Sequence, residues 1–354
     1  MNRRLDIEAA LALDEATRLE ASRIQREGRQ AAELSRLRNE SKSLRHELSR
    51  TQQQLDAMLA LGKQPVKPME IKPTGRPHEA AFVLLCSDWH VGETVLKDAV
   101  SGRNEFNPAI ASKRIDKLIE GALWMMEAWR AGKDGYGWKL DTMVAWIGGD
   151  MISNYLHPDL AESNAMSPTQ ELLFAEQLIC RMLDTFAEKA GVKRIICPTS
   201  FGNHGRTTPD RRVSTGWANS FEWLLYNQLA HRYNGKGKVH IQVGKDEISR
   251  LDVLGHKLRF NHGDTFGYGG GVGGITIPAR KWLAKLDATE KATLTAVGHW
   301  HQYLDIGDML VNGCLIGWGA YSQRVAPYSP ASQVCCLIDQ KYGKRLSTEI
   351  VVQT

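Results

Sequence analysis

Five short apolar runs of the sequence are each followed by histidine, aspartate or asparagine beside a glycine or another turn-forming residue. In the pairs Asp88/His90 and His299/His301, a single residue separates two side chains of metal-binding type. Side chains at i and i+2 of an extended segment point to the same side, so each pair could reach one centre. The candidate ligands, in chain order, are Asp88, His90, Asp150, Asn203, His262, His299 and His301.

This ligand set has three oxygen donors and four imidazoles, which suit Mn, Fe or Zn rather than calcium or a thiolate-seeking metal. Seven ligands are too many for one ion and fit two ions that share a carboxylate. Two divalent ions about 3.5–4 Å apart lower the pKa of bound water and clamp a phosphate during in-line displacement. The sequence therefore predicts two divalent metal ions, with Mn²⁺ expected and Fe, Zn or Mg as alternatives.

In chain order the five motifs resemble those of the calcineurin-like metallophosphoesterase superfamily, whose pattern is D-x-H, G-D, G-N-H, H and G-H-x-H. The resemblance covers residues 80–302. It implies that Asp150 bridges two metal ions. One ion would be held by Asp88, His90, Asp150 and His301, and the other by Asp150, Asn203, His262 and His299.

The resemblance also implies a catalytic role for His204, the histidine of the G-N-H motif. In the family this imidazole contacts the scissile phosphate and protonates the leaving oxygen, a role that suits an ordinary histidine pKa of about 6.5. Many members have an acidic residue directly after this histidine to orient it, where this chain has Gly205 followed by Arg206. Asp88 or another carboxylate would therefore have to orient His204.

The apolar runs are predicted β-strands, and amphipathic helical stretches alternate with them. Strands are expected at 80–86, 143–147, 194–197, 257–260, 294–297, 309–311 and 334–338, and helices at 108–130, 168–190, 216–232 and 277–287. Alternating strands and helices with polar strand exits are typical of an α/β domain whose helices cover a central sheet. The pattern alone predicts a single doubly wound sheet. The resemblance instead implies an α+β arrangement, a calcineurin-like β-sandwich flanked by helices, with a mixed sheet split in two.

Residues 1–62 are predicted to form a helical, coiled-coil arm, because they are rich in Ala, Leu, Glu, Arg and Gln and contain no proline. A mainly apolar heptad pattern runs through Leu34, Leu37, Ser41, Leu44, Leu48, Thr51, Leu55 and Met58. Such a pattern favours pairing with another helix, so we expect a homo-oligomer. The alternative is a solitary charged helix lying on the main domain. A proline-rich linker is expected at 63–78, and the metallophosphoesterase domain at 79–354.

Length and composition exclude several classes of protein. The 354 residues, 42% of them hydrophobic, suffice for one large domain and an appendage. A net charge of +5 permits an anionic partner without requiring one. Six cysteines without a CxxC pair, and no signal-peptide pattern, predict reduced thiols and a cytoplasmic protein. No apolar run approaches the roughly 18 residues of a membrane span, so no membrane partner is expected.

Three further features bear on packing and on the substrate. Tryptophans on helical stretches, namely Trp124, Trp129, Trp223 and Trp282, are expected in the core. Arg206, Arg211 and Arg212 follow His204 closely and could grip phosphate oxygens, or could form a solvated loop whose charge Asp210 partly offsets. The glycine-rich segment 267–274 could act as a flap beside His262 or as a plain flexible loop.

Three functions are compatible with these observations. The first is a phosphodiesterase acting on DNA, similar to the repair-exonuclease branch of the superfamily. The second is a phosphomonoesterase or a small-nucleotide phosphodiesterase. The third is a non-enzymatic coiled-coil assembly protein, which the intact ligand set disfavours. The helical arm and the stretch 202–208 also resemble members encoded by bacteriophages, for which the location would be the host cytoplasm.

Overall fold

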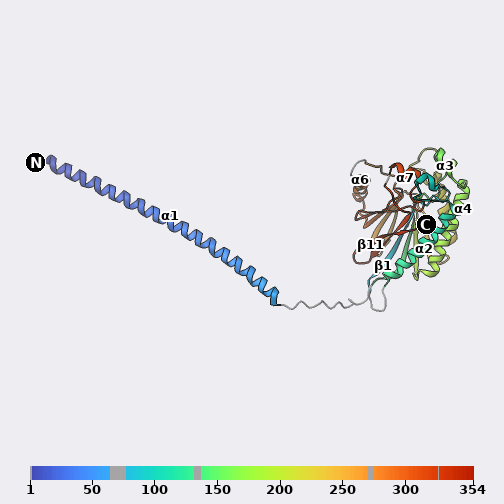
Figure 1. Cartoon of the computed structure of the whole chain (residues 1–354), viewed down its shortest axis with the longest axis horizontal. Coiled ribbons are helices and arrows are strands. Elements are labelled where there is room, and N and C mark those ends of the chain that lie inside the picture. Colours follow the sequence, from blue (N-terminus) through green and yellow to red (C-terminus); the bar gives the residue numbers. More distant parts are fainter. Residues whose placement is uncertain (1, 64–76, 131–136, 270–273, 326) are drawn as a thin grey trace. The chain divides into compact units, whose positions relative to one another are not determined.

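The computed structural model describes residues 2–63, 77–130, 137–269, 274–325 and 327–354. The chain divides into two compact units, residues 1–72 and 73–354. The first contains α1 (Asn2–Lys63), one uninterrupted helix that extends well before the heptad pattern (Figure 1). Most of the predicted linker, 63–78, lies outside the described residues. Within the described residues, no helix is long and apolar enough to cross a membrane.

The second unit is built on two β-sheets. The six-stranded sheet has the order β11-β10-β1-β2-β3-β4. Strands β1 to β4 run parallel to one another, and β10 is antiparallel to both of its neighbours, β1 and β11. The five-stranded sheet has the order β5-β6-β7-β9-β8, with β6, β7 and β9 parallel. The strands of the first sheet are β1 (Glu79–Cys86), β2 (Lys139–Ile147), β3 (Arg194–Pro198), β4 (Val239–Gln242), β10 (Ser332–Asp339) and β11 (Gly343–Val351). Those of the second are β5 (Ser249–Val253), β6 (His256–Asn261), β7 (Leu294–Val297), β8 (Leu304–Asp305) and β9 (Met309–Val311).

Strand β1 shows how the two sheets pack, because alternate side chains of a strand point to opposite faces. Its residues Ala81, Val83 and Leu85 join a buried cluster that includes strands of both sheets. Within that cluster the rings of Trp146 in β2 and Phe260 in β6 stack with centroids 5.8 Å apart. The two sheets therefore form a sandwich, as the resemblance implied, and the single doubly wound sheet expected from the strand pattern is wrong.

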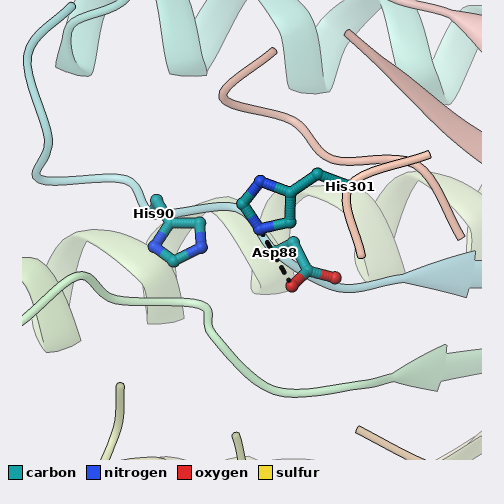
Figure 2. Close-up of side chains that lie close together, drawn as sticks. All are labelled: Asp88, His90 and His301. Carbon is teal, nitrogen blue, oxygen red and sulfur yellow. Dashed lines mark ion pairs between the residues drawn. The ribbon is translucent and has the colours of Figure 1, made fainter. Parts of the chain in front are cut away.

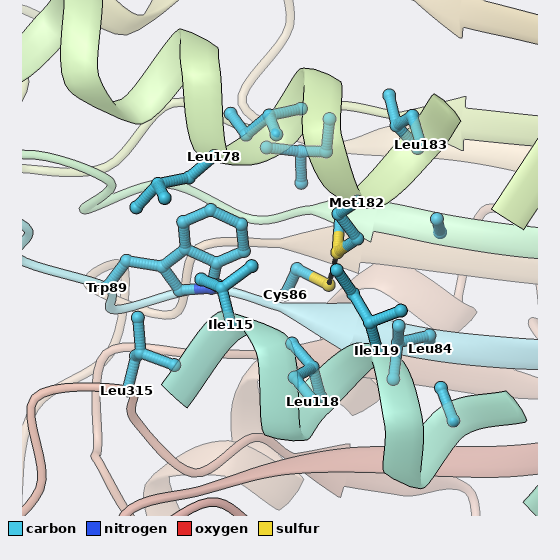
Figure 3. Close-up of a cluster of buried hydrophobic side chains, with 14 of the residues drawn as sticks. Leu84, Cys86, Trp89, Ile115, Leu118, Ile119, Leu178, Met182, Leu183 and Leu315 are labelled. Carbon is cyan, nitrogen blue, oxygen red and sulfur yellow. Dashed lines mark hydrogen bonds between the residues drawn. The ribbon is translucent and has the colours of Figure 1, made fainter. Parts of the chain in front are cut away.

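The other face of β1 packs against helices (Figure 3). Leu84 and Cys86 contribute to a second buried cluster with α2 (Pro108–Trp129) and α4 (Pro168–Lys189). Each helix begins where the sequence supplies a cap: the Asn107 side chain accepts a hydrogen bond from Ile110 N, and Ser167 starts a capping box. The helix α5 (Phe221–Tyr233) joins the same layer, and α6 (Thr276–Asp287) packs on the second sheet. The short helices are η1 (Lys97–Val100), α3 (Pro158–Ser163), η2 (Trp217–Asn219) and α7 (Ala320–Val325).

Some packing expectations need correction. Trp124 is 66% exposed on α2, so its expected place in the core is wrong, whereas Trp129 and Trp282 are partly buried against core clusters. All six cysteines are buried and free, which agrees with the expectation of reduced thiols.

The carboxylate of Asp339 fastens the turn between β10 and β11. It accepts hydrogen bonds from Trp138 Nε1 at 2.7 Å, from Lys341 N at 2.8 Å and from Tyr342 N at 3.0 Å. Burial raises the pKa of this carboxyl, but these hydrogen bonds outweigh it and leave the pKa below its ordinary value. The ionised form is therefore the one that stabilises the fold.

We expect Asp339→Asn to lower the free energy of unfolding at pH 7 by about 1–2 kcal/mol, because hydrogen bonds to a charged acceptor are weakened. The folded pKa lies below the unfolded value of about 3.9, so this stabilisation is present above that pH and is lost as the pH falls through the folded pKa. Urea unfolding at pH 7 and at stepwise lower pH measures both effects. Equal stability of the two proteins at pH 7, or a difference that grows in acid, would contradict the assignment.

Candidate metal centre

The predicted ligands come together because parallel strands of both sheets end at one edge of the sandwich. Asp88 and His90 follow β1, Asp150 follows β2 and Asn203 follows β3 in the first sheet. In the second sheet, His262 follows β6, and His299 and His301 follow β7. No single element carries the site, so its geometry depends on the register of the strands in the two sheets.

Six of these seven residues form two groups of three whose ligand atoms lie within 4.8 Å of one another. The first group is Asp88, His90 and His301, and the second is Asp150, His262 and His299. Figure 2 shows the first group, in which His301 Nε2 lies 3.3 Å from Asp88 Oδ1.

In the second group His262 Nε2 lies 3.1 Å from Asp150 Oδ2. The same nitrogen lies 3.2 Å from Asn203 Oδ1, which brings the seventh predicted ligand to this group. The protein thus has two adjacent groups that could each hold a metal ion. A bridging role for Asp150 stays a prediction.

The backbone of these loops adopts an uncommon conformation. The φ angle is positive at five predicted ligands: Asp88 (58°), His90 (47°), Asp150 (50°), His299 (68°) and His301 (55°). Residues other than glycine reach this region at a cost of about 1–3 kcal/mol each and cluster at functional sites. The expectation that extended backbone aligns Asp88 with His90 is therefore wrong, because both residues have positive φ angles, which an extended strand does not have.

Hydrogen bonds between the loops hold these turns in place. The backbone N–H of Asp88 donates to Gly149 O and that of His90 donates to Asp150 O, both at 3.0 Å. The carboxylate of Asp88 accepts the backbone N–H of His299 at 3.0 Å. The exits of β1, β2 and β7 are therefore joined to one another before any ligand binds, so the site is preorganised.

Two histidines are oriented so that one ring nitrogen remains for a metal. His262 Nδ1 lies 2.8 Å from Gly148 O, which keeps a proton on Nδ1 and directs Nε2 at the Asp150 carboxylate. His90 Nδ1 lies 3.3 Å from Ser153 Oγ. Among the described residues, the buried His90 Nε2 has no hydrogen-bond partner. A buried nitrogen without a partner costs free energy, and a metal ion would satisfy it, so the residues present fit a metal.

Metal binding needs ionised carboxylates and neutral imidazoles, and the pKa shifts of Asp150, His90 and His299 favour these forms. Burial lowers the pKa of His90 to about 3 and that of His299 to about 4. Burial raises the pKa of the Asp150 carboxyl, but His262 and His204 lower it well below its usual range. Burial would likewise lower the pKa of His262, but the Asp150 carboxylate raises it well above its ordinary value. Against the effect of burial, the pKa of His301 is also raised, by Cys314 and Asp88. A metal ion would therefore have to displace a proton from each of these two imidazoles.

His204 lies beside both groups and is oriented by backbone rather than by a carboxylate. Its Nδ1 lies 2.9 Å from the carbonyl oxygen of Ser153, and its ring centroid is 4.8 Å from that of His90. Its backbone N–H donates to Asp150 Oδ1 at 2.8 Å. The expectation that Asp88 could replace the missing acidic residue and orient His204 is wrong. The Asp88 carboxylate instead contacts Ser87, His299 and His301. A proton on Nδ1 leaves Nε2 as the atom that exchanges protons with a substrate.

Sequence reasoning missed two buried carboxylates that accept hydrogen bonds from the backbone of the loops that carry the ligands. Glu222 of α5 accepts hydrogen bonds from Met151 N at 2.6 Å and Gly202 N at 2.7 Å, next to Asp150 and Asn203. Glu171 of α4 accepts from Ser153 N at 2.6 Å and Asn154 N at 3.1 Å. The sequence contained a signal for Glu222, because it stands at helical spacing with the apolar residues Leu225, Tyr226 and Leu229. The structure buries all four of these positions of α5. An acidic residue on an apolar stripe indicates a buried partner.

Burial, and secondarily the nearby Asp150 carboxylate, raise the pKa of Glu222 to about 8. We expect Glu222→Gln to lower the free energy of unfolding by about 1–3 kcal/mol, because an amide nitrogen cannot accept the hydrogen bond that one oxygen now receives. Metal affinity should also fall, by about ten- to a hundredfold, as for other groups that orient ligands. Denaturant unfolding and calorimetric Mn²⁺ titration measure the two effects. The matched control is Glu188→Gln at an exposed position of α4, and equal behaviour of the two variants would refute the supporting role.

Two of the three arginines predicted to bind substrate, Arg206 and Arg211, are engaged within the protein. Arg206 donates to Asn203 O at 2.8 Å and to the carbonyls of Thr208 and Pro209. Arg211 pairs with the carboxylates of Glu247 and Asp264, each at 3.1 Å. Arg212 is exposed. All three line a cavity of only about 30 Å³. The role of these arginines in substrate binding stays a prediction. It is weakest for Arg211, because two carboxylates already neutralise its charge.

A much larger cavity, of about 730 Å³, opens beside the metal-binding groups. Asp150, His204, His299 and His301 form one part of its lining. The glycine-rich segment also reaches it through Tyr268 and Gly274, while residues 270–273 of the expected flap lie outside the described residues. A substrate in this cavity would contact His204 and both groups at once.

Comparison with known proteins identifies no family, since no family model and no curated protein matches the chain. Among solved structures, a hypothetical protein from Pyrococcus horikoshii is similar over 77% of this chain and 88% of its own, with 11% identity and a TM-score of 0.35. Vps29 complexed with Zn²⁺ from Entamoeba histolytica is similar over 77% and 99%, with 11% identity and a TM-score of 0.29. The sulfate thiohydrolase SoxB from Thermus thermophilus, in complex with glycerol, is similar over 80% and 58%, with 12% identity and a TM-score of 0.30. These TM-scores are too low to carry an argument about function.

Proposed function

We propose that this chain is a dinuclear-metal phosphoesterase of the calcineurin-like type that hydrolyses phosphodiester bonds. One observation carries the proposal: two adjacent three-residue ligand groups meet at one large cavity, which His301 of the first group, Asp150 and His299 of the second, and His204 line. The unpartnered Nε2 of His90 and the positive φ angles of five predicted ligands support it, because both are costly features that a metal centre explains.

Asp88, His90 and His301 would hold one ion, and Asp150, Asn203, His262 and His299 the other. The ions, when bound, supply Lewis acidity and lower the pKa of bound water. The Ser153 carbonyl keeps the proton of His204 on Nδ1, so Nε2 in its protonated state can donate to the leaving oxygen. The hydrogen-bonded loops keep these side chains in place, so little reorganisation is needed when substrate binds.

The narrower proposal is nuclease-like cleavage of DNA, with phosphomonoesterase or small-nucleotide activity as the alternative. The size of the 730 Å³ cavity supports a substrate larger than a simple phosphate group. Association with phage-encoded members and a cytoplasmic location remain predictions.

The test is hydrolysis with Mn²⁺ of bis-p-nitrophenyl phosphate, p-nitrophenyl phosphate, and labelled single- and double-stranded DNA, each with and without EDTA. Cleavage of DNA and the diester that EDTA abolishes would support the narrower proposal. Turnover of the monoester alone would replace it with a phosphatase. No turnover of any substrate by protein that binds Mn²⁺ would overturn phosphodiester hydrolysis as the proposed function.

A further inference from the structure

Four aromatic side chains, Tyr268, Trp300, Trp318 and Tyr321, line the 730 Å³ cavity together with the metal-binding groups. We call them the aromatic wall. Tyr321 is 78% exposed and Tyr268 is 63% exposed, although large aromatic side chains are usually buried. Trp300 comes from the loop that carries His299 and His301, so the wall and the metal centre share a loop. The aromatic surface is therefore continuous with the place where a phosphate would react.

The remaining lining favours an uncharged group beside the wall. Its polar members outside the metal centre include Thr276, Gln302, Ser322 and Ser329, which can donate or accept hydrogen bonds without carrying charge. Among the described residues that line the cavity there is no lysine or arginine to hold a second phosphate. The guanidinium of Arg103 lies 5.4 Å from the centroid of the Trp318 ring, so one face of this ring is covered by a cation and a base would use the rest of the wall. A flat, neutral ring with hydrogen-bonding edges fits this surface better than a polyphosphate or a sugar phosphate does.

We propose that the aromatic wall stacks the nucleobase next to the phosphoester being hydrolysed, which makes the substrate a nucleotide ester or the end of a single strand. This inference rests on the proposed function and names its substrate class. Stacking of a base on an aromatic side chain contributes about 1–3 kcal/mol and tolerates any base. The wall would therefore select for nucleotides without selecting a sequence.

The test compares two diesters with one leaving group, thymidine 5′-(p-nitrophenyl phosphate) and methyl p-nitrophenyl phosphate. Trp318→Ala and Tyr321→Ala should each lower kcat/KM for the thymidine ester by about fivefold or more relative to the methyl ester. Trp318→Phe should restore most of the preference, which separates stacking from misfolding. The control is Trp124→Ala, an exposed tryptophan on α2.

Equal losses on both esters, or a wild-type protein without preference for the thymidine ester, would overturn the base-stacking inference and leave the phosphoesterase standing. Hydrolysis of neither ester would overturn the proposed function. In that case the wall is tested by binding of thymidine monophosphate, monitored through tryptophan fluorescence of wild type and Trp318→Phe. Absence of a binding signal would then overturn the wall as well.

A different observation concerns α1, whose heptad positions are exposed. We call them the α1 seam: Leu34, Leu37, Ser41, Leu44, Leu48, Thr51, Leu55 and Met58. The apolar members are all exposed, from 48% at Leu55 to 71% at Met58. A helix with such a stripe gains free energy by covering it with a partner.

The charges beside the α1 seam indicate which partner fits. The residue before each leucine or serine at the first heptad position is acidic in three successive repeats: Glu33, Glu40 and Glu47. The residue after the second heptad position is basic in two, Arg38 and Arg45. Among the described residues of α1, the ion pairs within the helix lie before residue 28, so these five side chains are not paired along their own helix.

These charges match a second copy of the helix in only one orientation. In a parallel, in-register pair, Glu33 of one copy faces Arg38 of the second, and Glu40 faces Arg45. In an antiparallel pair, acidic rows face acidic rows and basic rows face basic rows, which is repulsive. We propose that the α1 seam joins a second copy of this chain as a parallel, two-stranded coiled coil.

Disulfide trapping in the full chain tests the orientation, because all six native cysteines are buried. Residues 41 and 51 lie at equal distances from the two ends of the seam. Ser41→Cys alone should cross-link to itself when the pair is parallel. A mixture of Ser41→Cys and Thr51→Cys should give mixed disulfides only when the pair is antiparallel, and that outcome would overturn the proposal.

Charge exchange tests the pairing itself. Arg38→Glu with Arg45→Glu makes one chain acidic on both sides of the seam, and Glu33→Arg with Glu40→Arg makes another basic. Each variant alone should dissociate at least about tenfold more readily than wild type in sedimentation equilibrium, and mixing the two should restore pairing. A monomeric wild type at micromolar concentration, or variants that pair as well alone as when mixed, would refute it.

Discussion

Replacing Asp150 by asparagine is expected to abolish hydrolysis and to weaken metal binding more than any other single change. Asp150 lies at the exit of β2, one oxygen accepting the backbone N–H of His204 and the other lying 3.1 Å from His262 Nε2. Asparagine keeps the shape but removes the negative charge that holds a cation and offers one fewer acceptor atom. Loss of a residue that only orients metal ligands lowers metal affinity by about ten- to a hundredfold. The affinity for Mn²⁺ should fall by more than this in Asp150→Asn, because Asp150 is itself a predicted ligand.

Calorimetric titration with Mn²⁺ measures this prediction directly, and hydrolysis of bis-p-nitrophenyl phosphate measures its consequence. The matched control is Asp159→Asn, because Asp159 is exposed on α3. Thermal unfolding of both variants without metal checks that the fold persists. Wild-type stoichiometry and affinity for Mn²⁺ in Asp150→Asn would show that the second group is not a metal site.

The gathering of the ligands could be predicted from the sequence because each lies directly after an apolar run. A strand such as β1 is recognised by its composition alone, and parallel strands place their carboxyl ends at one edge. The gathering of Asp88, Asp150 and His299 at one edge therefore follows from three local sequence patterns and one rule of topology. The division into two sheets does not follow in this way, because it depends on which strands pair. β10 lies beside β1 although Leu84 and its partner Cys335 are 251 positions apart in the chain, and no local signal encodes that pairing.

The groups that orient the site could be predicted less well, because they act through the backbone. The contact between His204 and the Ser153 carbonyl leaves no trace in residue type, so the absence of an acid after His204 was misleading. The pairing of Arg211 with Glu247 and Asp264 joins residues far apart in sequence. Short strands with polar positions, such as β4 and β5, also escaped prediction because their apolar runs are too short to stand out.

His204→Ala is expected to lower kcat by about 10²–10⁴-fold for a diester with a poor leaving group, because no proton then reaches the leaving oxygen. Mn²⁺ binding should be unchanged, since His204 belongs to neither three-residue group and its backbone N–H remains available to Asp150. This combination distinguishes a proton donor from a metal ligand.

The leaving group supplies the sharpest test of that role, because p-nitrophenolate departs without a proton whereas a nucleoside alkoxide does not. The loss in His204→Ala should therefore be large for a dinucleotide and much smaller for thymidine 5′-(p-nitrophenyl phosphate). His231→Ala, at an exposed position of α5, is the matched control and should leave both rates unchanged. Equal losses on the two substrates would assign His204 to holding the phosphate rather than to protonating the leaving oxygen, and loss of Mn²⁺ binding would place it among the ligands.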